Sequence, residues 1–572
     1  MHTFRSKSPY SPPAFVELLS LLLALSAFDS TEAQLGPPPE PVGNPLTEDK
    51  ARLGKALFWD EQLSSTRTVA CGTCHIPKDG GDDPRSANDP LAIHPGPDGV
   101  FGGADDVFGS PGVPLSAADG TYDYSPSFAL LPQVTGRRTI SSVNAGYSSS
   151  LFWDGRAGEE FVDPVTETVV LASGAALESQ ALGPLLSDVE MAHVGRTWTE
   201  VLDRVAAIEP LALAGDVPAD LENWIAGRDY AALFEEAFGS PGITAPRIGM
   251  AIASYERTQF TDQTPFDDWL ITSTGLTVQE LAGRDVFLDS SCDRCHSGVA
   301  FTDHDFHYTG VRPHADDAGR FDVTELEDDR ARMRTPSLRN VELRAPYMRN
   351  GRFATLEDVI EFYNRGGDFD GPNKDAFIRE LMLTEQEKAD LLAFLTRPLT
   401  DSRLAEEQEP FDRPRLYTES WGLPVVYGSG VNSSQGILPR VAALEPPLLG
   451  NPNFTVGVYR ADGSTEGLLV IDDEDPGTDL LPTAGSLAHE TVFLSPDGVG
   501  TRHASVAISL PSAPGLEGKA YFGRWYVVSP GSNIPEAVSK PFAFKLFSAG
   551  SLDGIFQNGF ESGTTVFWTG TP

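Results

Sequence analysis

The sequence predicts a mainly α-helical region built from two repeated units, followed by a C-terminal all-β region. Three observations carry this prediction. All cysteines of the 572-residue chain fall in two C-x-x-C-H motifs, and a segment of helical periodicity precedes each motif. Beyond about residue 404 there is no cysteine, and short β-rich runs alternate with turn signals. The length also exceeds that of one ordinary domain, which agrees with several units.

The composition excludes several classes of protein. Hydrophobic residues make up 40% of the chain, enough to bury apolar cores, and the glycines and prolines lack the triplet period of collagen. Lys and Arg total 42 against 82 for Asp and Glu, giving a formal net charge of −40. Because that charge repels nucleic acid and anionic lipid, we expect neither as a partner. Basic proteins or cations are more compatible with this negative charge as partners.

Residues 1–33 have the pattern of a secretory signal peptide. Arg5 and Lys7 precede an apolar run at 15–28, and a cleavage-like end follows. The run is shorter than the roughly 20 residues that a membrane span needs, so we expect no membrane span and a periplasmic or secreted mature protein. A disordered start is the alternative, because Glu17 interrupts the run.

The motifs are Cys71-Gly72-Thr73-Cys74-His75 and Cys292-Asp293-Arg294-Cys295-His296. This spacing is typical of covalent c-type haem attachment, in which two thiols add to the haem vinyl groups and the adjacent imidazole ligates the iron. Two disulfides or structural zinc are the alternatives for an exported chain. Because the two motifs use every cysteine, we predict two covalently bound haem c groups, with His75 and His296 as iron ligands.

One pattern precedes both motifs. Leu46-Thr47 is followed by the helical run Leu53–Phe58, and Leu276-Thr277 by Ala282–Phe287. Each copy reads as a capped amphipathic helix that delivers the chain to its haem. A capping box at Thr384–Glu387 begins a closing helix in the second unit. We therefore infer two tandem cytochrome c-like haem domains.

The expected organisation of the chain follows from these units. It comprises the signal peptide at 1–33, a linker at 34–44, an N-terminal haem domain with long insertions at 45–275, a C-terminal haem domain at 276–403, and a linker with a β-sandwich-like domain at 404–572. The prediction of a sandwich is based on β-rich runs at 454–459, 467–471, 491–494, 504–510, 521–528 and 541–547. We expect a structural or adhesive role for it. The Asp- and Gly-rich run 97–106 is interpreted as an ordinary loop, with a Ca²⁺-binding loop as the alternative.

The segments around the motifs resemble the bacterial di-haem cytochrome c peroxidase family, including its MauG-like subgroup, over residues 45–400. The matching stretches are Leu53–His75, Leu151–Ala157, Ser179–Pro184, Asp188–Met191, Thr335–Asn340, Ala345–Met348 and Thr355–Gly367. The resemblance implies a peroxide site at the N-terminal haem and electron relay through the C-terminal haem. It does not extend to the β-rich region.

The resemblance also implies roles for three side chains of the N-terminal unit. Trp153 would bridge the haems for electron transfer, Glu190 would be the distal acid and base, and Gln180 its polar neighbour. Without the family, Trp153 is a core aromatic residue and Glu190 a helix-start acid capped by Ser187. A partly desolvated carboxyl group above a haem can have its pKa raised toward working pH, which suits proton exchange with peroxide.

The expected axial ligands differ from those of classical members of the family. No histidine lies between His94 and His193, where those members take a second ligand, so the peroxide haem is expected to be open at rest. At the relay haem, Tyr363 aligns with the classical methionine, as in the MauG-like subgroup. Met348 and Met333 are the alternatives. A phenolate donor would lower the haem potential relative to a thioether.

The resemblance implies a Ca²⁺ ion between the haem domains, bound by an asparagine side chain and by backbone carbonyls. Arg138 stands in place of that asparagine, whereas Arg344 and Pro346 match the carbonyl positions. Either Ca²⁺ binds with an altered ligand set or the guanidinium of Arg138 takes its place. A titratable pair of the family is also replaced, by Arg349-Asn350.

Together these observations predict a di-haem c-type peroxidase that reduces H₂O₂ to water at the N-terminal haem. Its electrons would come through the C-terminal haem from a small cytochrome c or a cupredoxin. One alternative is a MauG-like oxidase or oxygenase that modifies a protein or organic substrate, favoured by Tyr363 and the missing histidine. The other is a non-catalytic extracytoplasmic electron carrier, favoured by the β-rich region.

Overall fold

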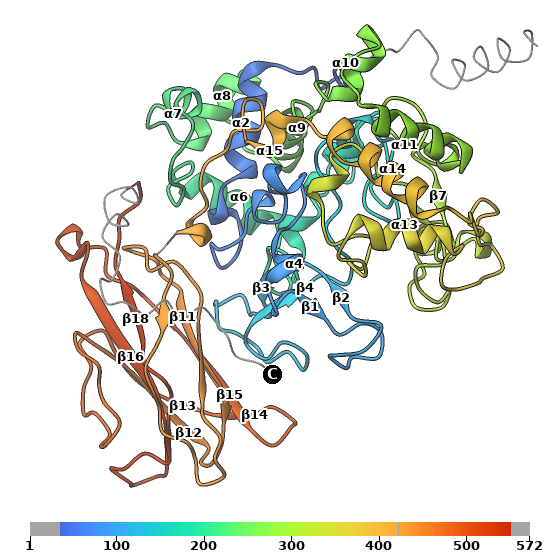
Figure 1. The fold of residues 1–572 in the computed structure, drawn as a ribbon. Coiled ribbons are helices and arrows are strands. Elements are labelled where there is room, and N and C mark those ends of the chain that lie inside the picture. The colour runs from blue at the N-terminus through green and yellow to red at the C-terminus, as the bar shows by residue number, and fades with distance from the viewer. Residues whose placement is uncertain (1–34, 421, 551–572) are drawn as a thin grey trace, which may run out of the picture.

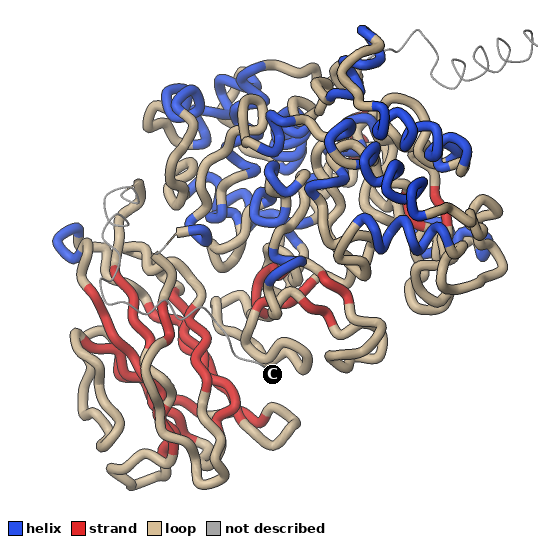
Figure 2. The backbone as a smooth tube through the Cα atoms, viewed as in Figure 1, coloured by secondary structure: helices blue, strands red, loops and turns tan. Residues whose placement is uncertain are grey.

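The computed structural model describes residues 35–420 and 422–550, so the predicted signal peptide lies outside the described residues. A helical region stands above and beside a β-rich region (Figure 1). The helices are α2 (Glu48–Phe58), α3 (Cys71–Cys74), α4 (Arg85–Asn88), α5 (Ala176–Ala181), α6 (Trp198–Ala207), α7 (Ala219–Ile225), α8 (Tyr230–Phe238), α9 (Ala245–Glu256), α10 (Pro265–Thr272), α11 (Val278–Asp289), α12 (Phe321–Thr324), α13 (Leu356–Asn364), α14 (Glu385–Leu395) and α15 (Ser402–Ala405). Helices outweigh strands before residue 406, but loops and turns occupy more of that region than helices do (Figure 2).

The two predicted motif-preceding helices are confirmed. The side chain of Thr47 caps α2 by accepting a hydrogen bond from the backbone N–H of Lys50. Thr277 and Glu280 form a capping box at the start of α11. A capping box also starts α14, at the predicted Thr384. Each motif-preceding helix packs against a later helix of its own unit, α2 against α9 and α11 against α14. These pairs lie in two separate apolar cores.

A glycine makes each of these helix pairs possible. A Cβ atom on Gly54 of α2 would lie 1.9 Å from the carbonyl oxygen of Ala251 in α9. A Cβ atom on Gly283 of α11 would lie 1.9 Å from the carbonyl oxygen of Asp390 in α14. Both glycines occupy the same place in the repeated sequence pattern. The repeat therefore encodes a close backbone contact as well as a helix.

We predict that Gly54→Ala and Gly283→Ala each lower the free energy of unfolding by about 1–3 kcal/mol, because backbone atoms cannot give way as flexible side chains do. The loss should occur although alanine is the better helix former. Thermal unfolding would measure it. Gly158→Ala is the control, since a Cβ atom there meets nothing within 4 Å. Equal unfolding midpoints for all three variants would contradict the close-contact argument.

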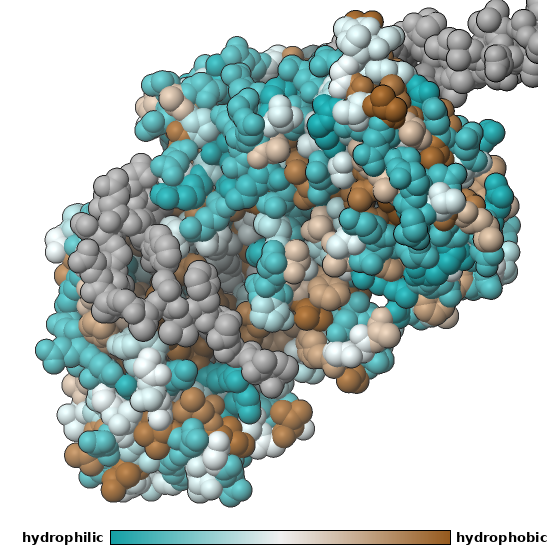
Figure 3. All heavy atoms as spheres, in the orientation of Figure 1, coloured by the Kyte–Doolittle hydropathy of each residue, from teal (hydrophilic) through white to brown (hydrophobic). Residues whose placement is uncertain are grey.

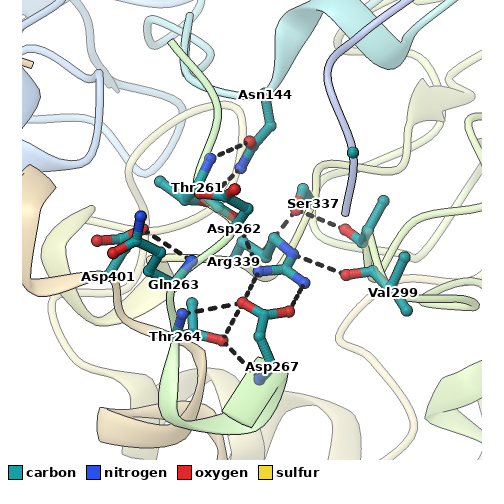
Figure 4. Close-up of polar contacts among 12 residues, drawn as sticks. Asn144, Thr261, Asp262, Gln263, Thr264, Asp267, Val299, Ser337, Arg339 and Asp401 are labelled. Carbon is teal, nitrogen blue, oxygen red and sulfur yellow. Dashed lines mark hydrogen bonds and ion pairs between the residues drawn. The ribbon is translucent and has the colours of Figure 1, made fainter. Parts of the chain in front are cut away.

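A buried polar network joins the two haem-motif units (Figure 4). Arg339 donates to both carboxylate oxygens of Asp267, at 2.6 and 2.9 Å, and its side chain is 1% exposed. It also donates to the carbonyl oxygens of Thr261 and Val299. The side chain of Asn144 in turn holds the backbone N–H of Thr261 at 2.9 Å. The network thus joins the segment before α10 to Asn144, earlier in the chain, and to Val299 and Arg339, later in the chain.

Removing the charge of Asp267 should destabilise the protein. We predict a loss of about 3–5 kcal/mol for Asp267→Asn, because the buried guanidinium of Arg339 then lacks its counterion. The neighbouring Asp268→Asn is the matched control: its side chain is exposed, and it should cost less than about 1 kcal/mol.

The same carboxylate gives a pH dependence. Burial alone would raise the pKa of Asp267, but the hydrogen bonds and charge of Arg339 outweigh burial and lower the pKa from 3.8. Its stabilisation is therefore present above pH 3.8 and is lost as the pH falls through the lowered pKa. Acid titrations of thermal unfolding should show a smaller loss in Asp267→Asn than in the wild type. Parallel acid titrations would contradict this role.

The C-terminal β-rich region is a two-sheet sandwich, as the sequence predicts. One sheet has the order β10-β11-β15-β14, and the other β13-β12-β16-β18-β9 with β17 paired to β16. The strands are β9 (Val425–Val426), β10 (Arg440–Ala443), β11 (Phe454–Ala461), β12 (Glu466–Asp472), β13 (Ala488–Phe493), β14 (Ser495–Pro496), β15 (Arg502–Ile508), β16 (Ala520–Val528), β17 (Ala537–Val538) and β18 (Phe542–Lys545). All pairs are antiparallel; β12 and β16 run from Glu466 opposite Val528 to Asp472 opposite Phe522. An apolar core with Phe454 and Trp525 fills the space between the sheets.

Buried polar contacts fasten the sandwich and the chain before it to the helical region. The carboxylate of Glu61 accepts hydrogen bonds from the backbone N–H groups of Tyr417 and Thr418 and from the Thr418 hydroxyl. The phenol of Tyr122 donates to the buried carboxylate of Glu445 at 3.1 Å. These contacts join residues more than 300 positions apart in sequence.

The polar excursion at 77–130 lies beside the sandwich, in the blue part of Figure 1. It contains β1 (Ile93–His94), β2 (Val107–Phe108) and β3 (Pro111–Pro114); β3 pairs with β4 (Pro132–Val134). Further two-stranded pairs join β5 (Phe161–Val162) to β6 (Val169–Leu171) and β7 (Phe306–His307) to β8 (Met333–Arg334). Among residues 35–420 and 422–550, every helix is too short or too polar to span a bilayer.

Candidate functional site

The first C-x-x-C-H motif forms the short helix α3 and ends at a half-buried histidine. All four cysteines are free thiols in the structure, which leaves them available for covalent attachment. Nδ1 of His75 lies 3.0 Å from the carbonyl oxygen of Gly81. Because a carbonyl only accepts, Nδ1 carries the proton and Nε2 is left as a metal donor. Burial lowers the pKa of His75, which keeps the ring neutral as ligation requires.

The second motif repeats this arrangement with different local structure. Residues Cys292–Arg294 form a single 3₁₀ turn, and the backbone N–H of His296 donates to the carbonyl oxygen of Cys292 at 2.9 Å. Nδ1 of His296 lies 3.1 Å from the carbonyl oxygen of Phe301. Burial lowers the pKa of His296 to about 4. Both histidines thus present a neutral ring with a free Nε2.

A cavity of about 1080 Å³ gathers the residues predicted for the peroxide site. His75, Trp153, Gln180 and Glu190 all line it. They come from four separate segments: the first motif, the loop after Leu151, helix α5, and the turn before Met191. A second acid, Glu256 at the end of α9, lines the same cavity and was missed by the sequence analysis. Burial raises the pKa of Glu256 to about 8, and its Oε2 has no hydrogen-bond partner.

Glu190 sits in a turn, which rules out the alternative interpretation of this residue as a helix-start acid. Its backbone N–H donates to the Ser187 hydroxyl at 3.3 Å, but residues 188–191 form a turn without a following helix. The strand β3 fixes this turn, because Val113 N–H donates to the Val189 carbonyl at 3.1 Å. A Cβ atom on Gly112 would lie 2.0 Å from that carbonyl oxygen, so only glycine fits there. Burial raises the pKa of Glu190 above its ordinary value, and the charge of Arg156 partly opposes this.

Trp153 forms part of the wall between two cavities. It lines the larger cavity and also a smaller one of about 240 Å³ that holds the second motif. Its indole N–H donates to the carbonyl oxygen of Arg138 at 2.8 Å. Its own carbonyl accepts from the backbone N–H of Arg334 at 2.8 Å. These bonds hold the indole in contact with both spaces.

The smaller cavity contains all three candidate sixth ligands. Tyr363 lies on α13, whereas Met333 and Met348 lie on β8 and in a loop. All three line the cavity together with His296. The Tyr363 ring packs edge-on against Phe362, with 4.9 Å between ring centroids. The positions of the three side chains therefore leave Tyr363, Met333 and Met348 as candidates for the sixth ligand.

Buried unpaired groups around the cavities fit the carboxylates of a haem. The Nε atoms of Arg138, Arg334 and Arg344 are buried and have no hydrogen-bond partner. All three arginines line the smaller cavity, and Arg138 lines both. Among the described residues, these three arginines form an ion pair with one carboxylate, that of Asp82, which lies 2.9 Å from Arg138. Because buried charge needs a counterion, this cluster calls for added anions, and haem propionates meet that need.

Arg138 occupies the place that the resemblance assigned to a calcium ligand. Its guanidinium contacts Asp82 and reaches the carbonyl oxygen of Ala345 at 3.4 Å. Ala345 lies between the two residues whose carbonyls match the family's calcium site. The cation of Arg138 therefore stands in the neighbourhood expected for the ion.

Comparisons with known proteins find similar haem proteins. Residues 48–274 match the family model of di-haem cytochrome c peroxidase. The matched region contains the first haem-attachment motif and is similar to that family. The methylamine utilization protein MauG of Methylorubrum extorquens is 29% identical over 361 residues, which cover 62% of this chain and 80% of the relative. The cytochrome c551 peroxidase of Nitrosomonas europaea is 29% identical over 357 residues, which cover 61% and 84%.

Among solved structures, a MauG-like protein associated with microbial copper homeostasis is 29% identical; the match covers 66% of this chain and 96% of that chain, with a TM-score of 0.47. The relatives include enzymes named cytochrome c peroxidases, and a di-haem peroxidase family carries covalently bound haem c. The chain is accordingly a haem oxidoreductase of the peroxidase class. MauG and peroxidase relatives match it equally well.

Proposed function

We propose that this chain is a periplasmic or secreted di-haem c-type peroxidase, with tandem cytochrome c-like haem domains at 45–275 and 276–403. It reduces H₂O₂ to water at the His75 site and receives electrons through the His296 site from a small cytochrome c or a cupredoxin. One observation carries the proposal: the larger cavity gathers His75, Gln180 and Glu190, and it shares Trp153 with the cavity of His296.

The residues of the larger cavity have separate tasks. A haem bound at His75 supplies the iron to which peroxide binds and which accepts its oxidising equivalents. Glu190 takes a proton from peroxide and returns it to the leaving oxygen, a transfer that a carboxyl group of raised pKa performs near neutral pH. Gln180 donates a hydrogen bond from its amide that orients peroxide. Trp153 carries electrons between the cavities, because its oxidisable indole lies in their shared wall.

The surface favours a basic electron donor. The chain has a formal net charge of −40, and the visible face of the helical region is largely hydrophilic (Figure 3). Such a surface attracts a positively charged protein over a distance of about a Debye length, roughly 8 Å at physiological salt. Raising the ionic strength should therefore weaken association with a basic cytochrome.

A MauG-like oxidase acting on a protein or organic substrate is the second candidate. The position of Tyr363 in the cavity of His296 favours it, because an anionic phenolate would stabilise the oxidised state of a haem bound there. Turnover of reduced cytochrome c with H₂O₂ distinguishes the two candidates. A second assay, with H₂O₂ and an oxidisable protein or organic substrate, distinguishes both from a non-catalytic electron carrier, which would show no turnover in either assay.

We predict that Glu190→Gln lowers the rate of peroxide reduction by about 10²–10⁴-fold, because glutamine keeps the shape but cannot exchange the proton. Stopped-flow absorption with reduced cytochrome c would measure the rate. Glu235→Gln, at an exposed position on α8, is the control and should leave the rate unchanged. Covalent haem content must be equal in both variants. A rate that Glu190→Gln leaves intact would remove Glu190 from the mechanism.

The same residue predicts the pH profile. Glu190 acts in its ionised form, and burial favours the neutral acid, raising the pKa from 4.5. The wild-type rate should therefore begin to fall at a higher pH than an exposed glutamate would allow, and Glu190→Gln should lack this acid limb. An acid limb of the same midpoint in both proteins would assign the titration to another group.

We predict that Tyr363→Phe changes the electron paramagnetic resonance spectrum of the haem at His296 and raises its reduction potential, because an anionic donor is lost. Tyr347→Phe is the matched control, since Tyr347 lines the same cavity. Met348→Leu and Met333→Leu test the alternative ligands. A spectrum altered by either methionine variant and not by Tyr363→Phe would reassign the ligand.

A further inference from the structure

A tryptophan outside the larger cavity packs directly on the first haem-attachment motif. Trp59 follows α2, and its side chain is 1% exposed. A Cβ atom on Gly72, between the two cysteines of the motif, would lie 2.2 Å from the Trp59 ring. The indole thus fills the space that any other residue at 72 would need. The proposed peroxidase mechanism gives Trp59 no task.

Trp59 is joined to a tyrosine and to the proximal histidine by aromatic contacts. Its indole N–H donates to the phenol oxygen of Tyr255 at 3.0 Å. The Phe58 ring lies 5.6 Å from the Trp59 ring and 5.2 Å from the Tyr255 ring, measured between centroids. The same Phe58 ring lies 6.3 Å from the ring of His75. Rings in this contact sequence lie close enough for an electron to pass between them.

The charges around Trp59 permit a positive charge on the indole. The guanidinium of Arg413 lies 5.3 Å from the Trp59 ring centroid, which alone would oppose oxidation of the ring. That charge is neutralised, because Arg413 pairs with Glu407 at 2.7 Å and with Glu419 at 2.6 Å. Nearby, Lys55 pairs with Asp412 at 2.9 Å. This group of five residues therefore holds one more negative than positive charge.

We propose that Trp59 is a second internal electron donor to the His75 site, separate from Trp153, and that Tyr255 is its positioning residue. The inference rests on the proposed peroxidase function. Tryptophan and tyrosine are the side chains most readily oxidised by one electron, and Trp59 combines that chemistry with contact to the haem-attachment motif.

The electron balance is simple. Reduction of H₂O₂ to two water molecules consumes two electrons and two protons. When no external donor is present, Trp59 would supply one of the two electrons and a haem bound at His75 the other, while both protons come from solvent through Glu190. The indole radical cation that remains keeps its N–H proton in the hydrogen bond to Tyr255. An electron from the external donor later restores Trp59. The pair thereby spares other cavity residues from oxidation.

The test uses the full-length protein with both haems bound. One equivalent of H₂O₂ is added without donor, the mixture is frozen within milliseconds to seconds, and the organic radical is recorded by electron paramagnetic resonance. Ring-deuterated tryptophan should narrow the wild-type signal. Trp59→Phe should abolish that tryptophan signal, whereas Trp525→Phe, which removes an equally buried indole from the sandwich, should retain it. Trp153→Phe should also retain it.

Several outcomes overturn the inference. A tryptophan signal that persists in Trp59→Phe, or that disappears only in Trp153→Phe, rejects Trp59 as the donor. If Trp59→Phe fails to bind haem, Tyr255→Phe decides, because it removes only the hydroxyl: a radical of unchanged shape and lifetime rejects the pair. If peroxide leaves the haem absorption unchanged in the wild type and in every variant, the proposed peroxidase function is rejected, and this inference is rejected with it. A haem reaction with its radical elsewhere leaves the peroxidase function standing and rejects Trp59 alone.

Discussion

The ion pair between Arg339 and Asp267 sets the geometry on which the proposed chemistry depends. Its two charges are buried, and Arg339 also holds the carbonyl oxygens of Thr261 and Val299. Val299 lies three residues after His296, while Thr261 is bonded to Asn144 in the N-terminal unit. A single guanidinium thus joins the chain near one motif to the chain that leads toward Trp153. Because each bond is directional and shielded from water, the two cavities have little freedom to shift.

A fixed junction matters because Trp153 faces both cavities. The rate of electron transfer between separate sites depends steeply on the distance between them. Trp153 can therefore carry electrons between the cavities only if the distance across it stays fixed. Two hydrogen bonds of Trp153 belong to this same wall: its indole N–H donates to the Arg138 carbonyl, and its own carbonyl accepts from the Arg334 N–H. The buried arginine cluster adds positive charge beside it. This positive charge would favour the reduced state of a nearby haem. Propionates that neutralise the charge would weaken this effect, so haem binding and the reduction potential are coupled.

Local features of the site could be predicted from sequence, whereas features made by packing could not. The two motifs and the helices before them follow from spacing and capping residues that are close together in the chain, and Thr47 and Thr277 cap as expected. The β-sandwich followed from alternating runs and turns. The resemblance singled out Glu190, which lines the cavity together with His75, but its turn was not foreseen, because strand β3 imposes it from 76 residues away.

Glu256 is the clearest example of a site residue that the sequence alone does not reveal. It ends an ordinary helix, and nothing in its neighbourhood in the sequence distinguishes it from a surface acid. The packing of α9 against α2 and α5 brings it to the cavity, where its Oε2 has no hydrogen-bond partner. The three arginines whose Nε atoms lack a hydrogen-bond partner are similar, since no single segment of the sequence reveals their shared need for anions.

The segment between the second haem unit and the sandwich has a consequence for how this protein can be divided. Although its composition is that of a tether, Leu404 and Phe411 are fully buried, Arg413 covers Trp59, and Glu61 binds the backbone at Tyr417. A shortened form ending at 403 would uncover the first haem unit. Any shortened form that keeps these contacts must therefore extend to at least about residue 419, and gene fusions should respect that border.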